Sequence, residues 1–233
     1  MVHILFLPGF GIHDTPLYYQ TILTHIESMH HVQFIAVDGY TYSGSRYLGA
    51  VSMATVLDEC LSICSRLTTP YILMGHSSGA VLAGHLYPLL IEKPLEVILI
   101  NPMTCPPRLR VCRNWIPLPT VLRWIADWLP MPLITTVHDT KIVTMMKYRL
   151  WNDIGRACAQ SFLVSLPQTA TIISSSRDPI GRGLDTNYCK HERVSFPGHD
   201  AFRSNACMLH IKACIDRVSP GHQLFENLFL EED

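Results

Sequence analysis

Three residues whose types can together perform nucleophilic chemistry stand in order along the chain: Ser77, Asp178 and His199. A serine hydroxyl is a weak nucleophile at neutral pH unless a histidine accepts its proton and a carboxylate orients that histidine. The order nucleophile, acid, histidine is typical of a serine on a sharp turn between a strand and a helix. We therefore predict Ser77 as the nucleophile, Asp178 as the orienting acid and His199 as the general base.

The local sequence predicts how each of these residues is positioned. Ser77 lies in the pentapeptide Gly-His-Ser-Ser-Gly, which follows the apolar run 71–74 and leads into the apolar run 80–83. Glycine has no Cβ, so it lets a strand and a helix approach closely on either side of a strained serine. Asp178 and His199 follow the runs 171–173 and 193–196, so all three residues lie just beyond predicted strands.

Two of the three assignments have alternatives in the sequence. Asp185 is a second candidate for the acid. His191 and His210 are second candidates for the base, although His191 precedes its predicted strand and His210 falls inside the last predicted helix. The other histidines lack the His-x-x-x-His spacing beside a carboxylate, so no metal site is expected.

Six short apolar or β-branched runs predict the strands of a sheet, at residues 2–7, 33–37, 71–74, 97–100, 171–173 and 193–196. Between them lie segments with apolar residues three or four positions apart, as in 47–64 and 82–89. Alternation of strands and helices predicts an α/β fold with about six mostly parallel strands flanked by helices. Ligands of such sheets bind at the carboxyl ends of the strands.

Residues 103–166 form one long segment between two predicted strands, more than a single crossover helix requires. We predict a helical cap here, inserted into a core of residues 1–102 and 167–233. The segment holds all four tryptophans and carries eight basic against three acidic side chains, whereas the rest of the chain carries ten basic and sixteen acidic ones. We expect apolar residues of the cap to line an acyl-chain pocket, among them Trp124, Trp128 and Met145. We expect its basic residues to attract an anionic partner, among them Arg108, Arg110 and Arg123.

The composition limits the class of protein. A net charge of −1 gives no electrostatic argument for nucleic-acid binding, and 48% hydrophobic residues in 233 can form a sizeable core. The eight cysteines show no Cys-x-x-Cys pair, which favours buried free thiols. The sequence shows neither a signal peptide nor an apolar run of about 18 residues, so we expect a cytoplasmic protein without a transmembrane segment.

The chain resembles the α/β-hydrolase family from Leu5 to about Cys214. The resemblance rests on the pentapeptide around Ser77, the Asp178 loop, Pro197-Gly198-His199 and the early loop of residues 7–11. It implies that the backbone N–H groups of Phe10 and Ser78 form an oxyanion hole. Pro8 stands where the family often has histidine, which leaves the backbone donor of that loop in place.

The resemblance implies a serine hydrolase that forms an acyl intermediate on Ser77 and needs no cofactor. A basic, apolar cap is similar to that of hydrolases of acyl groups on acyl carrier proteins, such as the pimeloyl-carrier-protein methyl ester esterases of biotin synthesis. Four alternatives remain open: a general carboxylesterase or lipase, an acyl-CoA thioesterase, a lyase or C–C hydrolase of the menaquinone-pathway type, and a non-catalytic binding module.

Overall fold

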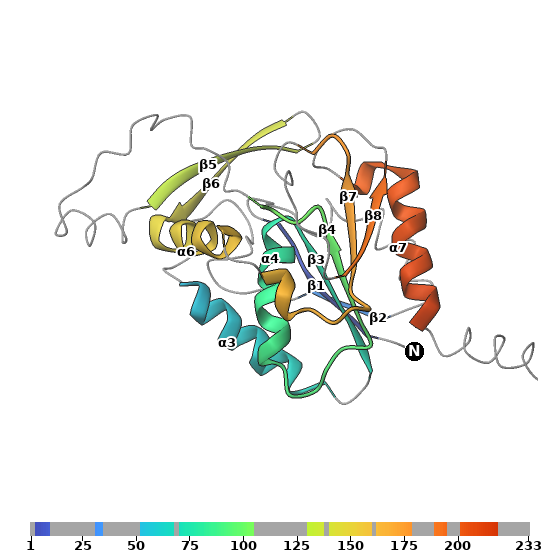
Figure 1. Ribbon diagram of the computed structural model, residues 1–233. Coiled ribbons are helices and arrows are strands. Elements are labelled where there is room, and N and C mark those ends of the chain that lie inside the picture. Colours follow the sequence, from blue (N-terminus) through green and yellow to red (C-terminus); the bar gives the residue numbers. More distant parts are fainter. Residues whose placement is uncertain are drawn as a thin grey trace, which may run out of the picture.

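The computed structural model describes residues 3–9, 31–34, 52–67, 70–104, 130–137, 140–159, 162–178, 189–194 and 201–218 (Figure 1). Its centre is a six-stranded sheet in which every neighbouring pair is parallel, in the order β2-β1-β3-β4-β7-β8. The strands are β1 (His3–Leu7), β2 (His31–Phe34), β3 (Tyr71–His76), β4 (Glu96–Ile100), β7 (Thr171–Ser175) and β8 (Lys190–Val194). All six strands predicted from the apolar runs are confirmed, although β2 and β8 begin two and three residues earlier than expected.

Helices cover both faces of the sheet, on opposite sides in Figure 1. One face packs against α3 (Met53–Cys64), α4 (Ser78–Leu86), α6 (Tyr148–Ala159) and the 3-10 turn η2 (Phe162–Ser165). The other face packs against the 3-10 turn η3 (Ala201–Arg203) and α7 (Asn205–Val218). A third 3-10 turn, η1 (Tyr87–Leu89), ends α4. Leu73 and Ile72 on β3 are 0% exposed but belong to the two different faces, as burial on both sides of a parallel sheet requires.

The insertion differs from the helical cap that we expected, because its described part contains two antiparallel strands as well as one helix. The strands are β5 (Pro130–Val137) and β6 (Thr140–Lys147), which pair over their full lengths and leave two residues between them. β-Branched residues at 134–137 and 142–144 favour this extended structure over a helix. Residues 105–129 lie outside the described part, so the boundaries of the predicted cap remain a prediction.

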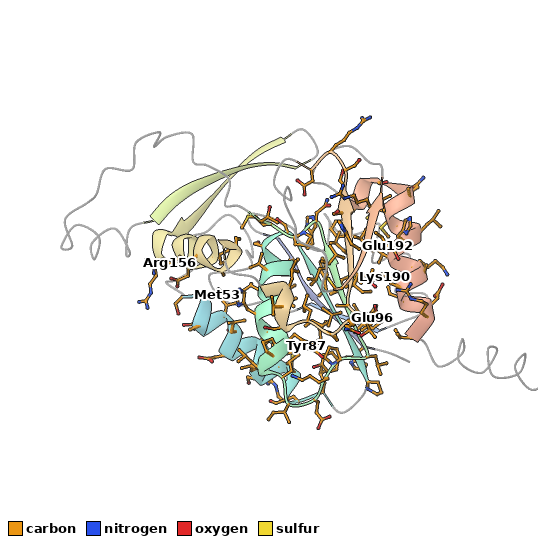
Figure 2. All side chains as sticks on the ribbon, in the orientation of Figure 1. Met53, Tyr87, Glu96, Arg156, Lys190 and Glu192 are labelled. Carbon is orange, nitrogen blue, oxygen red and sulfur yellow. The ribbon has the colours of Figure 1, made fainter. Side chains whose placement is uncertain are left out.

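Two polar contacts attach the helix of the insertion to the core. The carboxylate Oδ2 of Asp153 on α6 accepts the backbone N–H of Met53 at 3.3 Å. Met53 lies at the amino end of α3, where Figure 2 labels it. Ring Nε2 of His85 on α4 lies 3.3 Å from the carbonyl oxygen of Ala157. Ile154 on α6 is 0% exposed and belongs to the same core cluster as α3 and α4. This helix therefore covers the sheet as a crossover helix does.

A charged cluster lies at the opposite end of the sheet from Ser77. The hydroxyl of Thr171 donates to Oε1 of Glu96 at 2.9 Å, and Arg217 on α7 donates to that hydroxyl at 3.2 Å. Glu192 contacts Lys190 at 2.7 Å and His210 at 2.6 Å. Burial raises the pKa of Glu96 above its ordinary value. The Thr171 hydroxyl and the Arg217 guanidinium stabilise this buried carboxyl group.

The buried thiols yield a testable prediction. Burial raises the pKa of Cys60 and of Cys207 to about 12, so the reactive thiolate is almost absent from the folded protein at pH 8. We expect iodoacetamide at pH 8 to modify both cysteines far more slowly in the native protein than in guanidinium chloride, as followed by peptide mass spectrometry. Half-buried Cys189 is the internal comparison and should react faster. Equal rates at Cys60 and Cys189 in the native state would contradict the burial of Cys60.

The same pKa shifts predict a loss of stability at alkaline pH. Unfolded thiols lose their protons near pH 8.5, whereas Cys60 and Cys207 keep theirs in the folded state until about pH 12. The folded state therefore binds more protons above pH 8.5, and the free energy of unfolding falls by up to about 1.4 kcal/mol per pH unit for each such thiol. Urea denaturation at pH 8 and pH 10 measures this loss, and replacement of Cys60 by alanine should reduce it.

Candidate active site

Ser77 occupies a strained turn between β3 and α4. Its backbone angles are φ 57° and ψ −119°, in a region that residues with a Cβ rarely adopt. Among the described residues, only Ser77 and Asn101 combine a side chain with a positive φ. Such strain persists where the surrounding structure forces it, and it is concentrated at functional sites.

Backbone hydrogen bonds hold Ser77 in this conformation. Its N–H donates to the carbonyl of Ile100 at 3.0 Å, across the sheet on β4. Its own carbonyl accepts the N–H of Val81 at 3.4 Å, the first helical bond of α4, and the N–H of Met103 at 3.2 Å. The Ser77 side chain makes no capping bond to α4. The turn is therefore fixed from β4 through the main chain, without use of the hydroxyl as a cap.

Three glycines make room for the turn. A Cβ on Gly75 would lie 2.5 Å from the carbonyl oxygen of Gly79, and a Cβ on Gly79 would lie 2.5 Å from the carbonyl oxygen of Pro8. A Cβ on Gly9 would lie 3.0 Å from Cβ of Ser77. The contacts at Gly75 and Gly79 are closer than any Cβ tolerates, and the contact at Gly9 is tighter than most. The end of β1 and the start of α4 therefore pack backbone to backbone beside Ser77.

Asp178 lies just beyond the carboxyl end of β7 and is 3% exposed. A turn fixes its backbone, since the N–H of Asp178 donates to the carbonyl of Ser175 at 3.3 Å and the N–H of Arg177 donates to the Ser175 hydroxyl at 3.1 Å. β7 is separated from β3 by β4 alone, so Asp178 and Ser77 lie at the same edge of the sheet. The alternative acid, Asp185, lies outside the described residues.

His199 also lies outside the described residues, and the chain is described again from Ala201. Phe202 packs its ring against the ring of His76, the residue before Ser77, with centroids 4.7 Å apart. The alternative bases are engaged elsewhere. His191 lies 2.7 Å from the Ser174 hydroxyl, and burial together with the charge of Arg193 lowers its pKa. His210 lies on α7, 2.6 Å from a carboxylate oxygen of Glu192.

Only two of the remaining predicted site residues, Ser78 and Met145, lie in the described part of the chain. Ser78 is the first residue of α4 and is 0% exposed, whereas Phe10 lies outside the described residues. Met145 lies on β6 opposite Pro132. The other predicted cap residues lie outside the described part of the chain, namely Arg108, Arg110, Arg123, Trp124 and Trp128. The acyl-chain pocket stays a prediction.

Sequence reasoning missed Asn101, which follows β4 directly and is 0% exposed. Its side-chain oxygen accepts the N–H of Ser175 at 2.8 Å. An asparagine followed by proline at the end of an apolar strand was the available signal, but that pair is common in ordinary turns. Asn101 lies between the turn of Ser77 and the loop of Asp178.

No helix in the described ranges combines the length and hydropathy of a membrane span. Those ranges also contain no group of three or more histidine, cysteine, aspartate or glutamate side chains that could hold a metal ion. Of the predicted triad and oxyanion hole, the described ranges contain Ser77, Ser78 and Asp178.

The close approach around Gly79 predicts whether alanine at this position raises or lowers the free energy of unfolding. Alanine is normally more stable than glycine in a helix by about 1 kcal/mol. At Gly79 we expect Gly79→Ala instead to lower the free energy of unfolding by about 2 kcal/mol, because the methyl group meets the backbone of β1. Urea denaturation measures this, with exposed Ser62→Ala on α3 as a control that should be neutral or slightly stabilising. A stabilised Gly79→Ala protein would contradict the close approach.

Comparison with known proteins identifies the family of the chain. A sequence model described as "Alpha/beta hydrolase family" matches residues 4–225. A search of curated proteins found no match. Similar solved structures include a monoacylglycerol lipase from Paleococcus ferrophilus, with 14% identity, TM-score 0.67 and coverage of 93% of both chains. They also include the thioesterase domain from the curacin biosynthetic pathway, with 15% identity, TM-score 0.63 and coverage of 92% of this chain and 91% of that one.

The mouse alpha/beta hydrolase domain-containing protein 10 is similar at 16% identity and TM-score 0.59, over 93% of this chain and 90% of that one. At such identities these likenesses show the fold alone. The family model, in contrast, spans nearly the whole chain, and it includes the turn of Ser77 and the loop of Asp178. The chain belongs to the alpha/beta hydrolase family.

Proposed function

We propose that this protein is a serine hydrolase of carboxylic esters or thioesters. The observation that carries the proposal is the conformation of Ser77, a strained residue between β3 and α4 whose main chain is fixed from β4 and whose hydroxyl does not cap the helix. A tight turn with no chemical role has no need for this strain, because glycine would adopt the same φ at lower cost. Ser77 is then the nucleophile, with His199 as base and Asp178 as the acid that orients it.

The reaction proceeds in two halves. The Ser77 Oγ attacks the carbonyl carbon while His199 accepts its proton, and the carbonyl oxygen becomes an oxyanion. Collapse of this tetrahedral species breaks the bond to the leaving alcohol or thiol, which receives the proton from His199. Water then attacks the acyl-serine with His199 again as base, which releases the carboxylic acid and returns the proton to Ser77.

The backbone donors for the oxyanion come from two elements that meet at Ser77. Ser78 supplies an N–H at the start of α4, where the helix dipole also favours negative charge. Phe10 supplies the second N–H from the loop after β1. Its neighbour Gly9 supports this assignment, because a Cβ placed on Gly9 would lie only 3.0 Å from Cβ of Ser77, so the chain after β1 passes close to the nucleophile. Loss of one such donor costs about 3 kcal/mol of transition-state stabilisation in hydrolases.

The assignment of His199 is supported by its described neighbours. Ala201 is 0% exposed and Phe202 contacts His76, so the chain resumes next to the residue that precedes Ser77. His199 precedes Ala201 by only two positions in the sequence, and this short separation supports the proposal that His199 is the base. His191 and His210 have partners on β7 and β8 instead.

A fluorophosphonate probe tests the nucleophile. We expect covalent labelling at Ser77 in the native protein, none in Ser77→Ala and at least a 100-fold slower reaction in His199→Ala, because the hydroxyl then has no base. Mass spectrometry of the labelled peptide identifies the site. Exposed Ser62→Ala is the matched control and should be labelled at the rate of the native protein.

Two outcomes would contradict the proposal. A folded native protein that takes no label would favour a non-catalytic binding module. Labelling at Ser77 without turnover of any ester or thioester, but with cleavage of a diketone or elimination from a succinyl-cyclohexene substrate, would favour a C–C hydrolase or a lyase of the same fold. Product analysis by mass spectrometry distinguishes these reactions.

For the substrate we propose an acyl ester on an acidic carrier protein, such as a pimeloyl-carrier-protein methyl ester. The support is the excess of basic residues in 103–166. Two of them, Arg149 and Arg156, are exposed one heptad apart on α6, and Figure 2 shows Arg156 at the outer surface. A basic surface of this kind raises the association rate of an anionic partner. A lipase, a general carboxylesterase or an acyl-CoA thioesterase would not need a protein carrier.

Charge reversal tests the carrier. We expect glutamate at Arg108, Arg110 and Arg123 together to raise KM for a carrier-bound ester at least tenfold and to leave turnover of the free methyl ester unchanged, because the free ester makes no contact with the basic surface. Steady-state kinetics at two salt concentrations measures this. Arg66→Glu is the control, because Arg66 is exposed and lies outside the segment 103–166. Insensitivity of the carrier-bound ester to salt and to charge reversal would point to a small-molecule ester.

A further inference from the structure

Asn101 holds an unusual position at the end of β4. It is 0% exposed and has φ 41°, the second side-chain-bearing residue with a positive φ in the described part of the chain. Asparagine tolerates this conformation better than most residues, but glycine adopts it at lower cost. Backbone conformation alone therefore does not account for an asparagine here, whereas the hydrogen bond of its side chain does.

Asn101 is bonded to β7 through both its main chain and its side chain. Its N–H donates to the carbonyl of Ile173 at 2.8 Å, which extends the pairing of β4 with β7 by one residue. Its side-chain oxygen accepts the N–H of Ser175 at 2.8 Å, the last residue of β7. Ser175 in turn accepts the N–H groups of Asp178 and Arg177, through its carbonyl and its hydroxyl. A short chain of hydrogen bonds thus leads from Asn101 to the backbone of Asp178.

The segment that contains Asn101 is also bonded to Ser77. Ile100, the residue before it, accepts the N–H of Ser77 at 3.0 Å. Met103, two residues after it, donates to the carbonyl of Ser77 at 3.2 Å. Residues 100 and 103 therefore bond to the N–H and the carbonyl of Ser77, and Asn101 between them bonds to Ser175, which leads to the Asp178 loop. The side chain of Asn101 crosses from this segment to the last residue of β7, three positions before Asp178.

We propose that Asn101 is a positioning residue, which fixes the loop of Asp178 relative to Ser77 through its bond to the Ser175 N–H. This inference rests on the proposed function and adds a residue to the machinery. A shift of about 1 Å in a group that orients a catalytic side chain can lower the rate about 100-fold. The carboxylate of Asp178 would then orient His199 poorly and stabilise its protonated form less.

The chain offers a matched control at the other end of the same two strands. The Thr171 hydroxyl donates to Glu96 at 2.9 Å, so Thr171→Val also removes a buried hydrogen bond between β4 and β7. Asn101→Gly removes the side-chain acceptor while it permits the positive φ. Asn101→Asp keeps an acceptor of the same length. The three variants separate the loss of a buried bond from the loss of this particular bond.

The experiment measures the rate of fluorophosphonate labelling at Ser77 and the hydrolysis of a p-nitrophenyl ester from pH 5 to 9, together with the melting temperature. We expect Asn101→Gly to lower the labelling rate and kcat about 100-fold with little change in KM. Its acid limb in kcat/KM should move to lower pH by about 0.5 to 1 unit, since an imidazole without its carboxylate has a lower pKa. Asn101→Asp should recover at least a tenth of the native rate. Thr171→Val should lose stability and keep the native pH profile.

A pH profile of Asn101→Gly that superimposes on that of the native protein would overturn the proposal, because a purely structural loss lowers the active fraction without a shift in pKa. Should the glycine variant fail to fold, Asn101→Ser takes its place, since a serine side chain is too short to reach the Ser175 N–H. The same readouts and the same outcomes then apply.

Hydrogen exchange separates this inference from the proposed function. In Asn101→Gly we expect faster exchange in the peptide of residues 174–178, and in Thr171→Val no change there. If the native protein takes no label at Ser77, the proposed hydrolase fails, but the bond between Asn101 and the Asp178 loop is still tested by exchange. Unchanged exchange in Asn101→Gly would overturn the positioning role whatever the activity.

Discussion

The first turn of α4 lies against the end of β1 with no space for a side chain between them, and the whole carboxyl edge of the sheet depends on this contact. Gly79 meets the carbonyl groups of Leu7 and Pro8, and Gly75 meets the backbone of the helix. Because β1, β3 and α4 pack backbone to backbone, the position of Ser77 follows from the sheet itself. Main-chain geometry varies less than side-chain packing, so the hydroxyl is held on a rigid support.

β4 connects the turn of Ser77 to β7 at the carboxyl edge of the sheet. It is bonded to the turn of Ser77 on one side and to β7 on the other, and it ends at the second strained residue, Asn101. The strain in the described chain is thus confined to two residues that follow neighbouring strands. Fully buried residues on both faces of β3 and β4 resist relaxation of these turns, because a dense interior tolerates little movement.

The sequence predicted the parts of the molecule that depend on local pattern. The six strands were visible because burial on both faces requires unbroken apolar runs such as 97–100, and the turn of Ser77 was visible because close packing requires glycine. The strands β5 and β6 were not predicted, since their sequences do not alternate strictly between apolar and polar residues. Asn101 was missed because its partner Ser175 is 74 positions away, and one sequence holds no record of such a contact. The roles of Asp178 and His199 remain predictions.

The two polar bonds between β4 and β7 bear on how this chain folds and varies. They join residues 74 and 75 positions apart, one at each end of the paired strands. A slip of one residue would break both and turn every side chain of β7 to the wrong face. Closing a loop of twice the length adds only about 0.6 kcal/mol of entropic cost. The pairing of β4 with β7 therefore keeps its register while the connecting segment changes in length. Residues 103–147, which precede α6, are thus the part of the chain where new segments can be accepted without rebuilding the sheet.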